Sequence, residues 1–128
     1  MNLPDAAKYY FPWEVNLASV PEGQALRTFG RLYSYDLVNS EAILTAQHNS
    51  VQHHISVCTK FVEPFQAQLG SLYIVLGETE LGNGEKITLK ARVFTCVEGM
   101  NLQLLEKAIL EQREYFQERE KQLEGNNS

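Results

Sequence analysis

The alternation of hydrophobic and polar residues predicts five short strands followed by one long helix. Pro64 interrupts the pattern between the third and fourth strands, so that at most a short helix or turn fits there. Gly30 lies inside the first strand and suggests a bulge or sharp bend, which a small closed barrel needs. The period of two, or an apolar run between turn signals, places the strands at residues 26–35, 42–47, 52–59, 71–77 and 87–97.

Five strands, a longer connection after the third and a terminal helix are the outline of an OB-fold. This five-stranded, partly open Greek-key barrel binds oligonucleotides and oligosaccharides in many proteins. We therefore predict a mainly β protein in which residues 24–100 form a single OB-fold. Periodicity alone leaves SH3-like barrels and small sandwiches as alternatives.

The regions on either side of the barrel differ in composition. Residues 1–23 form an arm with four aromatic residues and three prolines. Because four aromatic side chains seldom remain in water, we expect the arm to pack on the barrel, with a binding arm as the alternative. Residues 125–128 are expected to be a disordered tail.

Residues 101–124 carry hydrophobic and amphipathic side chains at spacings of three and four, which predicts an amphipathic helix capped by Asn101. Leu102, Leu105 and Ile109 are sufficient to close the end of a barrel. The stripe continues for about two further turns, which at 1.5 Å per residue would project beyond a small barrel. Because Tyr and Arg are enriched at interface hot spots, we predict a partner-docking surface over Gln112, Tyr115, Phe116 and Arg119, with self-packing as the alternative.

Length and charge narrow the class of protein. The chain has 128 residues, which is typical of one domain, and a net charge of −5. An acidic protein does not grip nucleic acid by its global charge, since phosphate neutralisation needs clustered Lys and Arg. Residues 98–128 hold seven glutamates against four basic residues, so any nucleic-acid contact is expected to be local and weak.

Two local sets of residues could still contact nucleic acid. The first strand interleaves guanidinium and aromatic groups on one side, which could follow phosphates and stack bases. The alternative is that its aromatics pack under the arm and its arginines are simply solvated. The candidates are Arg27, Phe29, Arg31, Tyr33 and, in the same series, Tyr35, together with Lys90 and Arg92 on the fifth strand.

The sequence does not favour an enzyme, a metal protein or a membrane protein. It contains no GxSxG, GxxxxGK[ST], HExxH or CxxC motif. Adjacent His53 and His54 point to opposite faces of a strand and Cys58 is far from Cys96, so no zinc site or other cofactor is expected. No apolar run is long enough to cross a bilayer. The first residues do not resemble a signal peptide, so both cysteines are expected to be reduced thiols in a cytosolic or nuclear protein.

Four stretches, covering most of the chain in order, resemble the smallest subunits of the vertebrate CST telomere complex, the Ten family. They are Tyr9-Tyr10-Phe11-Pro12-Trp13-Glu14-Val15, Leu26-Arg27-Thr28-Phe29-Gly30-Arg31-Leu32, Gly70-Ser71-Leu72-Tyr73-Ile74-Val75-Leu76-Gly77-Glu78 and Thr95-Cys96-Val97-Glu98-Gly99-Met100-Asn101-Leu102.

The resemblance implies a nuclear, non-enzymatic OB-fold subunit that pairs with the Stn subunit through their C-terminal helices. With the Ctc subunit the pair would form a trimer on G-rich telomeric single-stranded DNA. This trimer would cap telomeres, limit telomerase and recruit DNA polymerase alpha–primase for C-strand fill-in. The resemblance also implies Stn-facing roles for Met100, Leu105, Ile109, Tyr115 and Arg119, with Arg27 at the barrel edge as a weaker candidate. The alternative function is a stand-alone single-stranded nucleic-acid-binding OB protein.

Overall fold

The structure is a computed structural model, which describes residues 8–15, 22–81 and 87–125, with side chains as far as residue 121 in the last range. The chain divides into two compact units, residues 1–98 and residues 99–128, and each is described by itself. The expected tail at residues 125–128 lies outside the described residues, apart from Gly125, the last residue of a helix.

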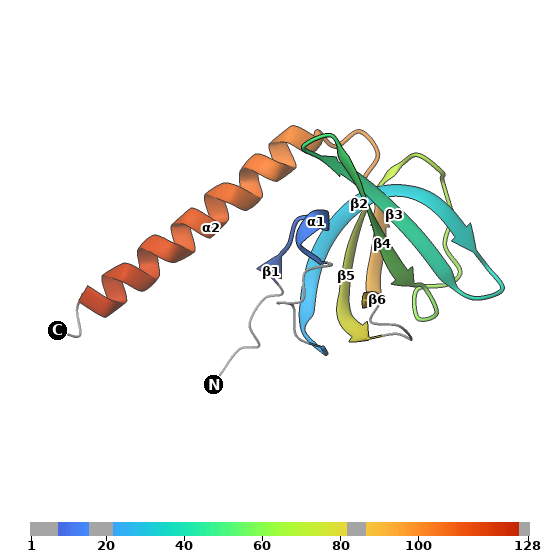
Figure 1. Ribbon diagram of the computed structural model, residues 1–128, viewed down its shortest axis with the longest axis horizontal. Helices are drawn as coiled ribbons and strands as arrows, with labels where there is room; N and C mark the ends of the chain where they lie inside the picture. The colour runs from blue at the N-terminus through green and yellow to red at the C-terminus, as the bar shows by residue number, and fades with distance from the viewer. Residues whose placement is uncertain (1–7, 16–21, 82–86, 126–128) are drawn as a thin grey trace. The chain divides into compact units, whose positions relative to one another are not determined.

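The first unit is a curved β-sheet whose first long strand also pairs with the last strand of the sheet order (Figure 1). The sheet order is β1-β2-β3-β4-β6-β5, and an additional β2–β5 pairing closes the ring. The β4–β6 pairing is parallel, whereas the other pairings among β2 to β6 are antiparallel. The elements are β1 (Lys8–Tyr9), α1 (Pro12–Val15), β2 (Ala25–Asp36), β3 (Glu41–His48), β4 (Val51–Cys58), β5 (Leu72–Leu81) and β6 (Ile87–Cys96).

This arrangement confirms the predicted fold class, a mainly β protein with an OB-type barrel of five strands, β2 to β6. The alternation in the sequence located these strands to within a few residues, because each strand has one face toward the interior. The two-residue β1 and the short α1 were not predicted. They lie in the proline-containing arm, where β1 pairs in parallel with Leu26 and Arg27 of β2 and Phe11 is buried.

Alternate residues of the barrel strands fill the core. Leu26 and Leu32 of β2, Leu44 of β3, Val75 of β5 and Leu89 of β6 are fully buried there. Because every strand contributes, the core fixes the register of each pairing, and a shift of one residue would expose the apolar side chains. The outward-facing residues are therefore well defined.

Two glycines allow strands to approach closely. A Cβ on Gly30 would lie 2.8 Å from Leu44 Cβ, and a Cβ on Gly77 would lie 2.5 Å from the carbonyl oxygen of Lys90. Of the bulge or sharp bend expected at Gly30, the bulge is not there, since the register of β2 shifts between Leu32 and Ser34 instead. Gly30 allows β2 to approach β3 closely, because it has no side chain at the point where the two strands meet.

The second unit contains α2 (Leu102–Gly125), a helix of 24 residues. Asn101 confirms the predicted cap, since its Oδ1 accepts hydrogen bonds from the backbone N–H groups of Gln103 (2.9 Å) and Leu104 (3.2 Å). Gly99 has a φ of 86°, a conformation that favours glycine and turns the chain just before the cap. The helix therefore begins where the sequence placed it.

Candidate protein and nucleic-acid interfaces

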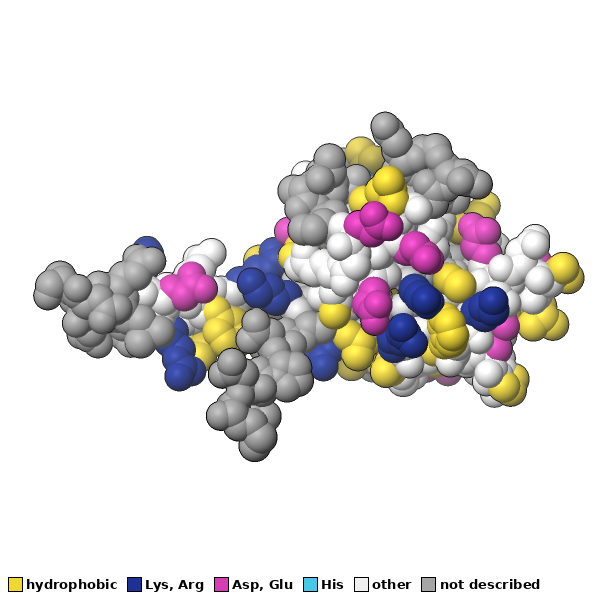
Figure 2. Space-filling view, turned by 90° about the horizontal axis from the view of Figure 1, so that it is seen from below, with side chains coloured by type: hydrophobic (Ala, Val, Ile, Leu, Met, Phe, Trp, Pro, Cys, Tyr) yellow, Lys and Arg dark blue, Asp and Glu magenta, His cyan; other side chains and the backbone are white. Residues whose placement is uncertain are grey.

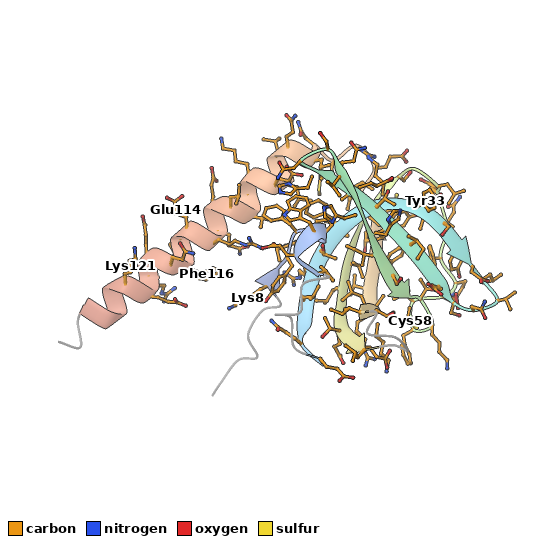
Figure 3. The ribbon with its side chains drawn as sticks, in the orientation of Figure 1. Lys8, Tyr33, Cys58, Glu114, Phe116 and Lys121 are labelled. Carbon is orange, nitrogen blue, oxygen red and sulfur yellow. The ribbon has the colours of Figure 1, made fainter. Side chains whose placement is uncertain are left out.

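The predicted partner-binding residues of α2 share one side of the helix. At about 100° per residue, they fall within an arc of about 120°. None of the glutamates between positions 102 and 121 lies in that arc, and Figure 3 shows Phe116 and Glu114 on opposite sides of the helix. We call this side the docking face; its members are Leu105, Ile109, Gln112, Tyr115, Phe116 and Arg119.

Large side chains at the far end of the docking face are exposed. Tyr115 is 57% exposed and Phe116 is 51% exposed, and their rings pack edge to face with centroids 5.7 Å apart. Gln112 and Arg119 are also exposed, whereas Leu105 is half-buried and Ile109 is buried. The two rings thus form a preformed aromatic pair with an open surface.

Met100 does not belong to this face. It is exposed, but it precedes the cap at Asn101 and lies outside the helix, and its expected Stn-facing role stays a prediction. The capping hydrogen bonds fix the first turn after Asn101, which leaves Met100 in the turn before it.

The predicted strip on β2 is not continuous. Phe29 is only 1% exposed and packs edge to face against Phe11 at 6.2 Å, so the prediction that its ring is open to a base was wrong. The physical reason is that the arm covers the outside of β2 at this point. Tyr35 is half-buried against Phe65, which removes a second aromatic from the strip.

Arg27 also differs from its predicted place at a barrel edge. It pairs with Tyr9 of β1 on one side and with Leu76 of β5 on the other. Its guanidinium carbon lies 5.9 Å from the centre of the Tyr9 ring, and the side chain is half-buried. Arg27 is therefore held within the sheet rather than presented at a free edge.

Arg31 and Tyr33 are the exposed members of the β2 set. Tyr33 is 63% exposed and meets the ring of His54 on β4 edge to face at 5.8 Å. Arg31 donates a hydrogen bond from Nη1 to the carbonyl oxygen of Gly70, 3.2 Å away. The structure thus leaves one aromatic and one cation of this set available on the outer surface.

Lys90 and Arg92 lie together on the outer side of β6, beside a residue that the sequence did not single out. Lys90 Nζ is 4.8 Å and Arg92 Cζ is 5.0 Å from the centre of the Phe61 ring. Arg92 Nε also lies 3.4 Å from Glu78 Oε1. Phe61 was missed because it follows the third strand by only a few residues, in a stretch without periodicity, and meets β6 about 30 positions later in the chain.

Glu63 anchors the loop that carries Phe61. Its carboxylate accepts hydrogen bonds from the hydroxyls of Tyr35, Ser40 (2.8 Å) and Thr59 (3.0 Å). The hydrogen bond from Tyr35, followed by that from Ser40, lowers the pKa of Glu63, while burial and this carboxylate raise the pKa of Tyr35. These contacts join the loop to β2 and to the turn before β3.

Two further groups have altered acidity. The side-chain amide of Asn39 and the backbone N–H groups of Asn39 and Val38 lower the pKa of Asp36, which closes the β2–β3 turn. Burial raises the pKa of Tyr73, whose hydroxyl bridges the backbone of Gln66 and Gln68. Both groups serve turns and loops of the barrel.

The described side chains offer no group of three or more His, Cys, Asp or Glu residues that could hold a metal ion. Cys58 and Cys96 are free thiols. Among the described helices, none is long and apolar enough to cross a membrane.

The geometry defines a class of protein, a small OB-fold barrel with a C-terminal amphipathic helix. The family model described as "Telomere-capping, CST complex subunit" matches residues 3–119. The chain belongs to this family.

Curated relatives agree with the family. The chain is 60% identical over 119 residues to the human protein named CST complex subunit TEN1, covering 93% of this chain and 97% of that protein. It is 53% identical over 118 residues to the mouse protein of the same name, covering 92% of this chain and 73% of that one. Their names are those of a subunit of a complex and not of an enzyme.

Solved structures agree with the fold. A chain of the Stn1–ten1 complex of S. pombe superposes with a TM-score of 0.67 at 21% identity, over 86% of this chain and 94% of that chain. The telomere capping protein Ten1 from Saccharomyces pombe gives 0.66 at 20% identity, over 85% and 99%. At this identity the likeness concerns the fold.

Proposed function

We propose that this CST-family subunit pairs directly with an Stn-type OB subunit through the docking face of α2. The observation that carries the proposal is the acid-free face of that helix, which presents the exposed rings of Tyr115 and Phe116. Large rings left open on a helix that is otherwise rich in glutamate are typical of a helix-in-groove contact.

The relatives support this partner. The S. pombe structure is that of a complex of Stn1 with ten1, and its matching chain shares the fold of this one. The human and mouse relatives are named as CST subunits at 60% and 53% identity. The partner proposed here is therefore a second OB subunit, with a Ctc subunit completing the trimer.

At telomeres in the nucleus, the complex would bind telomeric single-stranded DNA, cap chromosome ends, limit telomerase and support C-strand fill-in by DNA polymerase alpha–primase. In this scheme the chain is a non-catalytic scaffold. The net charge of −5 fits that role, because a subunit that stabilises a DNA-binding partner need not be basic itself.

Co-purification tests the pairing. Full-length chain and an Stn-type subunit, co-expressed and passed over a sizing column, should elute as a one-to-one complex, and Tyr115→Ala should reduce the recovery of the partner. Glu114→Ala, which alters the neighbouring residue outside the docking face, is the matched control. A chain that elutes as a monomer beside the free partner would refute the pairing.

The alternative, a stand-alone single-stranded nucleic-acid-binding protein working through β2, has weaker support. Phe29 is buried and Arg27 is held within the sheet, so the surface that this function required is reduced to Arg31 and Tyr33. Tight, salt-sensitive binding by the isolated chain that Arg31→Gln and Tyr33→Ala abolish would favour this alternative.

A further inference from the structure

One turn of the loop after β4 presents an aromatic ring to two cations from another strand. Phe61 is 52% exposed, and Lys90 and Arg92 both approach its ring within 5.0 Å of the centroid. The exposed Lys60 precedes Phe61 in the chain. We call these four residues, Lys60, Phe61, Lys90 and Arg92, the Phe61 cluster.

The backbone holds the cluster in place from both sides. On the loop side, the N–H of Thr59 donates to the carbonyl of Ser40 at 2.9 Å, and the N–H of Val62 closes the turn onto the carbonyl of Thr59 at 3.0 Å. Glu63 then ties the same turn to the hydroxyls of Ser40 and Thr59. The ring therefore sits on an anchored turn rather than on a free loop.

On the strand side, β6 has a bulge at the second cation. The β5–β6 register passes from Leu76 opposite Val93 to Gly77 opposite Ala91, which makes Arg92 the extra residue of β6. A bulge of this kind redirects a side chain. Lys90 and Arg92 are two positions apart on β6 and both lie against the Phe61 ring.

The Phe61 cluster carries positive charge, whereas the net charge of the chain is negative. Lys90 and Arg92 meet at one ring, with Lys60 next to it in the chain, in a protein of net charge −5, and Arg92 has a carboxylate partner in Glu78. Figure 2 shows Lys and Arg side chains beside hydrophobic and acidic ones on one face of the barrel. Like charges placed together repel, and an anionic ligand would relieve that repulsion.

We propose that the Phe61 cluster is a contact site for single-stranded nucleic acid, with phosphates on the three cations and a base stacked on the exposed part of the Phe61 ring. Stacking on an aromatic ring beside a positively charged track is how single strands bind without sequence readout. An acidic peptide would also satisfy the cations, but the side chains of Asp and Glu offer no aromatic group to stack on the ring. Nucleic acid therefore fits both features of the site.

The inference rests on the proposed function for the presence of single-stranded DNA, but it uses residues outside the docking face. The assay is fluorescence anisotropy of a labelled 18-nucleotide oligo(dT) with the full-length chain, alone and paired with an Stn-type subunit, at several salt concentrations. Phe61→Ala should weaken binding by the isolated chain about fivefold or more, which corresponds to about 1 kcal/mol for one stacked base. Leu69→Ala, another exposed apolar residue before β5, is the control and should leave affinity unchanged.

Charge removal gives a separate measurement. Lys90→Gln combined with Arg92→Gln should reduce the slope of log affinity against log salt by about 1.4, since each phosphate contact contributes about 0.7 for single strands. Lys107→Gln combined with Lys121→Gln is the matched control on the helix. Thermal melting of each variant, and crosslinks from an iododeoxyuridine-containing oligonucleotide that map to Phe61, separate a lost contact from a lost fold.

The proposal is overturned if the isolated chain does not bind the oligonucleotide at 50 mM salt, or if the cluster variants bind as the wild type does. It is also overturned if a polyglutamate peptide displaces the oligonucleotide as well as unlabelled DNA of equal charge does, since the site would then be a peptide site. All cluster variants should still co-purify with the Stn-type subunit. Failure of co-purification by the wild type would count against the proposed function and not against this site.

Discussion

Replacing Tyr115 by Ala removes the most exposed ring of the docking face and tests whether that face binds a partner. A Tyr side chain presents on the order of 200 Å² of surface, and the 57% exposure of Tyr115 leaves roughly 115 Å² to be covered by a partner. At about 25 cal/mol per Å², full burial of that surface contributes roughly 3 kcal/mol. Ordering the side chain costs about 0.5–1.5 kcal/mol, so a net loss of about 2 kcal/mol is expected.

The assay is isothermal titration of an Stn-type subunit into the full-length chain. A loss of about 2 kcal/mol corresponds to a dissociation constant roughly 30-fold higher for Tyr115→Ala. Glu114→Ala is the matched control, because its side chain lies outside the acid-free arc, and it should change the constant less than threefold. Circular dichroism of both variants checks that the helix is intact.

A docking role for Tyr115 is refuted if both variants lose affinity equally, because helix content or general charge would then explain the effect. It is also refuted if neither loses affinity while the wild type binds. In that case the exposed rings at the end of α2 serve another purpose.

Three further perturbations test the barrel and the start of the helix. Gly77→Ala should lower the free energy of unfolding by about 1–3 kcal/mol in a urea titration, because its Cβ would meet the carbonyl oxygen of Lys90 at 2.5 Å. An unchanged midpoint would show that the backbone of β6 shifts without an energetic cost. Asn101→Ala should cost about 1 kcal/mol by removing the cap, seen as lost helical signal on heating, and a melt identical to the wild type would contradict the cap. Glu63→Gln should destabilise the protein at pH 7, since the pKa of Glu63 is lowered in the folded state. The stability that the ionised Glu63 contributes is present above its ordinary pKa of 4.5 and disappears as the pH falls through the folded pKa, so the unfolding free energies of variant and wild type should converge in acid. A difference that stays constant with pH would show that the ionisation of Glu63 is not its cause.

The fold was predictable because its signals are local. Period-two alternation located the five barrel strands, and a polar residue before a period of 3.6 located the cap at Asn101. In the arm, such local signals did not predict the structure. Its prolines argued against a long helix, but the pairing of Lys8 and Tyr9 with β2 depends on a surface 18 positions away in the chain, which alternation does not encode.

The candidate sites were less predictable because strand parity does not say what covers a face. Parity placed Phe29 beside Arg31 and Tyr33, but Phe11 of the arm covers Phe29 and leaves the others exposed. In the helix the period was correct, since α2 begins at Leu102, directly after the predicted cap.

Phe61 shows a third limit on what the sequence alone can predict. It has no place in any periodic pattern, and its relation to Lys90 and Arg92 arises from the parallel β4–β6 pairing, which places Cys58 opposite Lys90 and so brings the turn after β4 beside β6. A pairing between strands separated in the chain by another strand is set by the closed barrel and not by local sequence. The same closure that makes a small barrel stable thus assembles surface clusters from distant residues, and in this chain it gathers cations on a barrel whose helix is acidic. The consequence is a division of labour that mutations can separate: changes at Tyr115 should act on protein pairing, whereas changes at Phe61 should act on nucleic-acid binding with the pair intact.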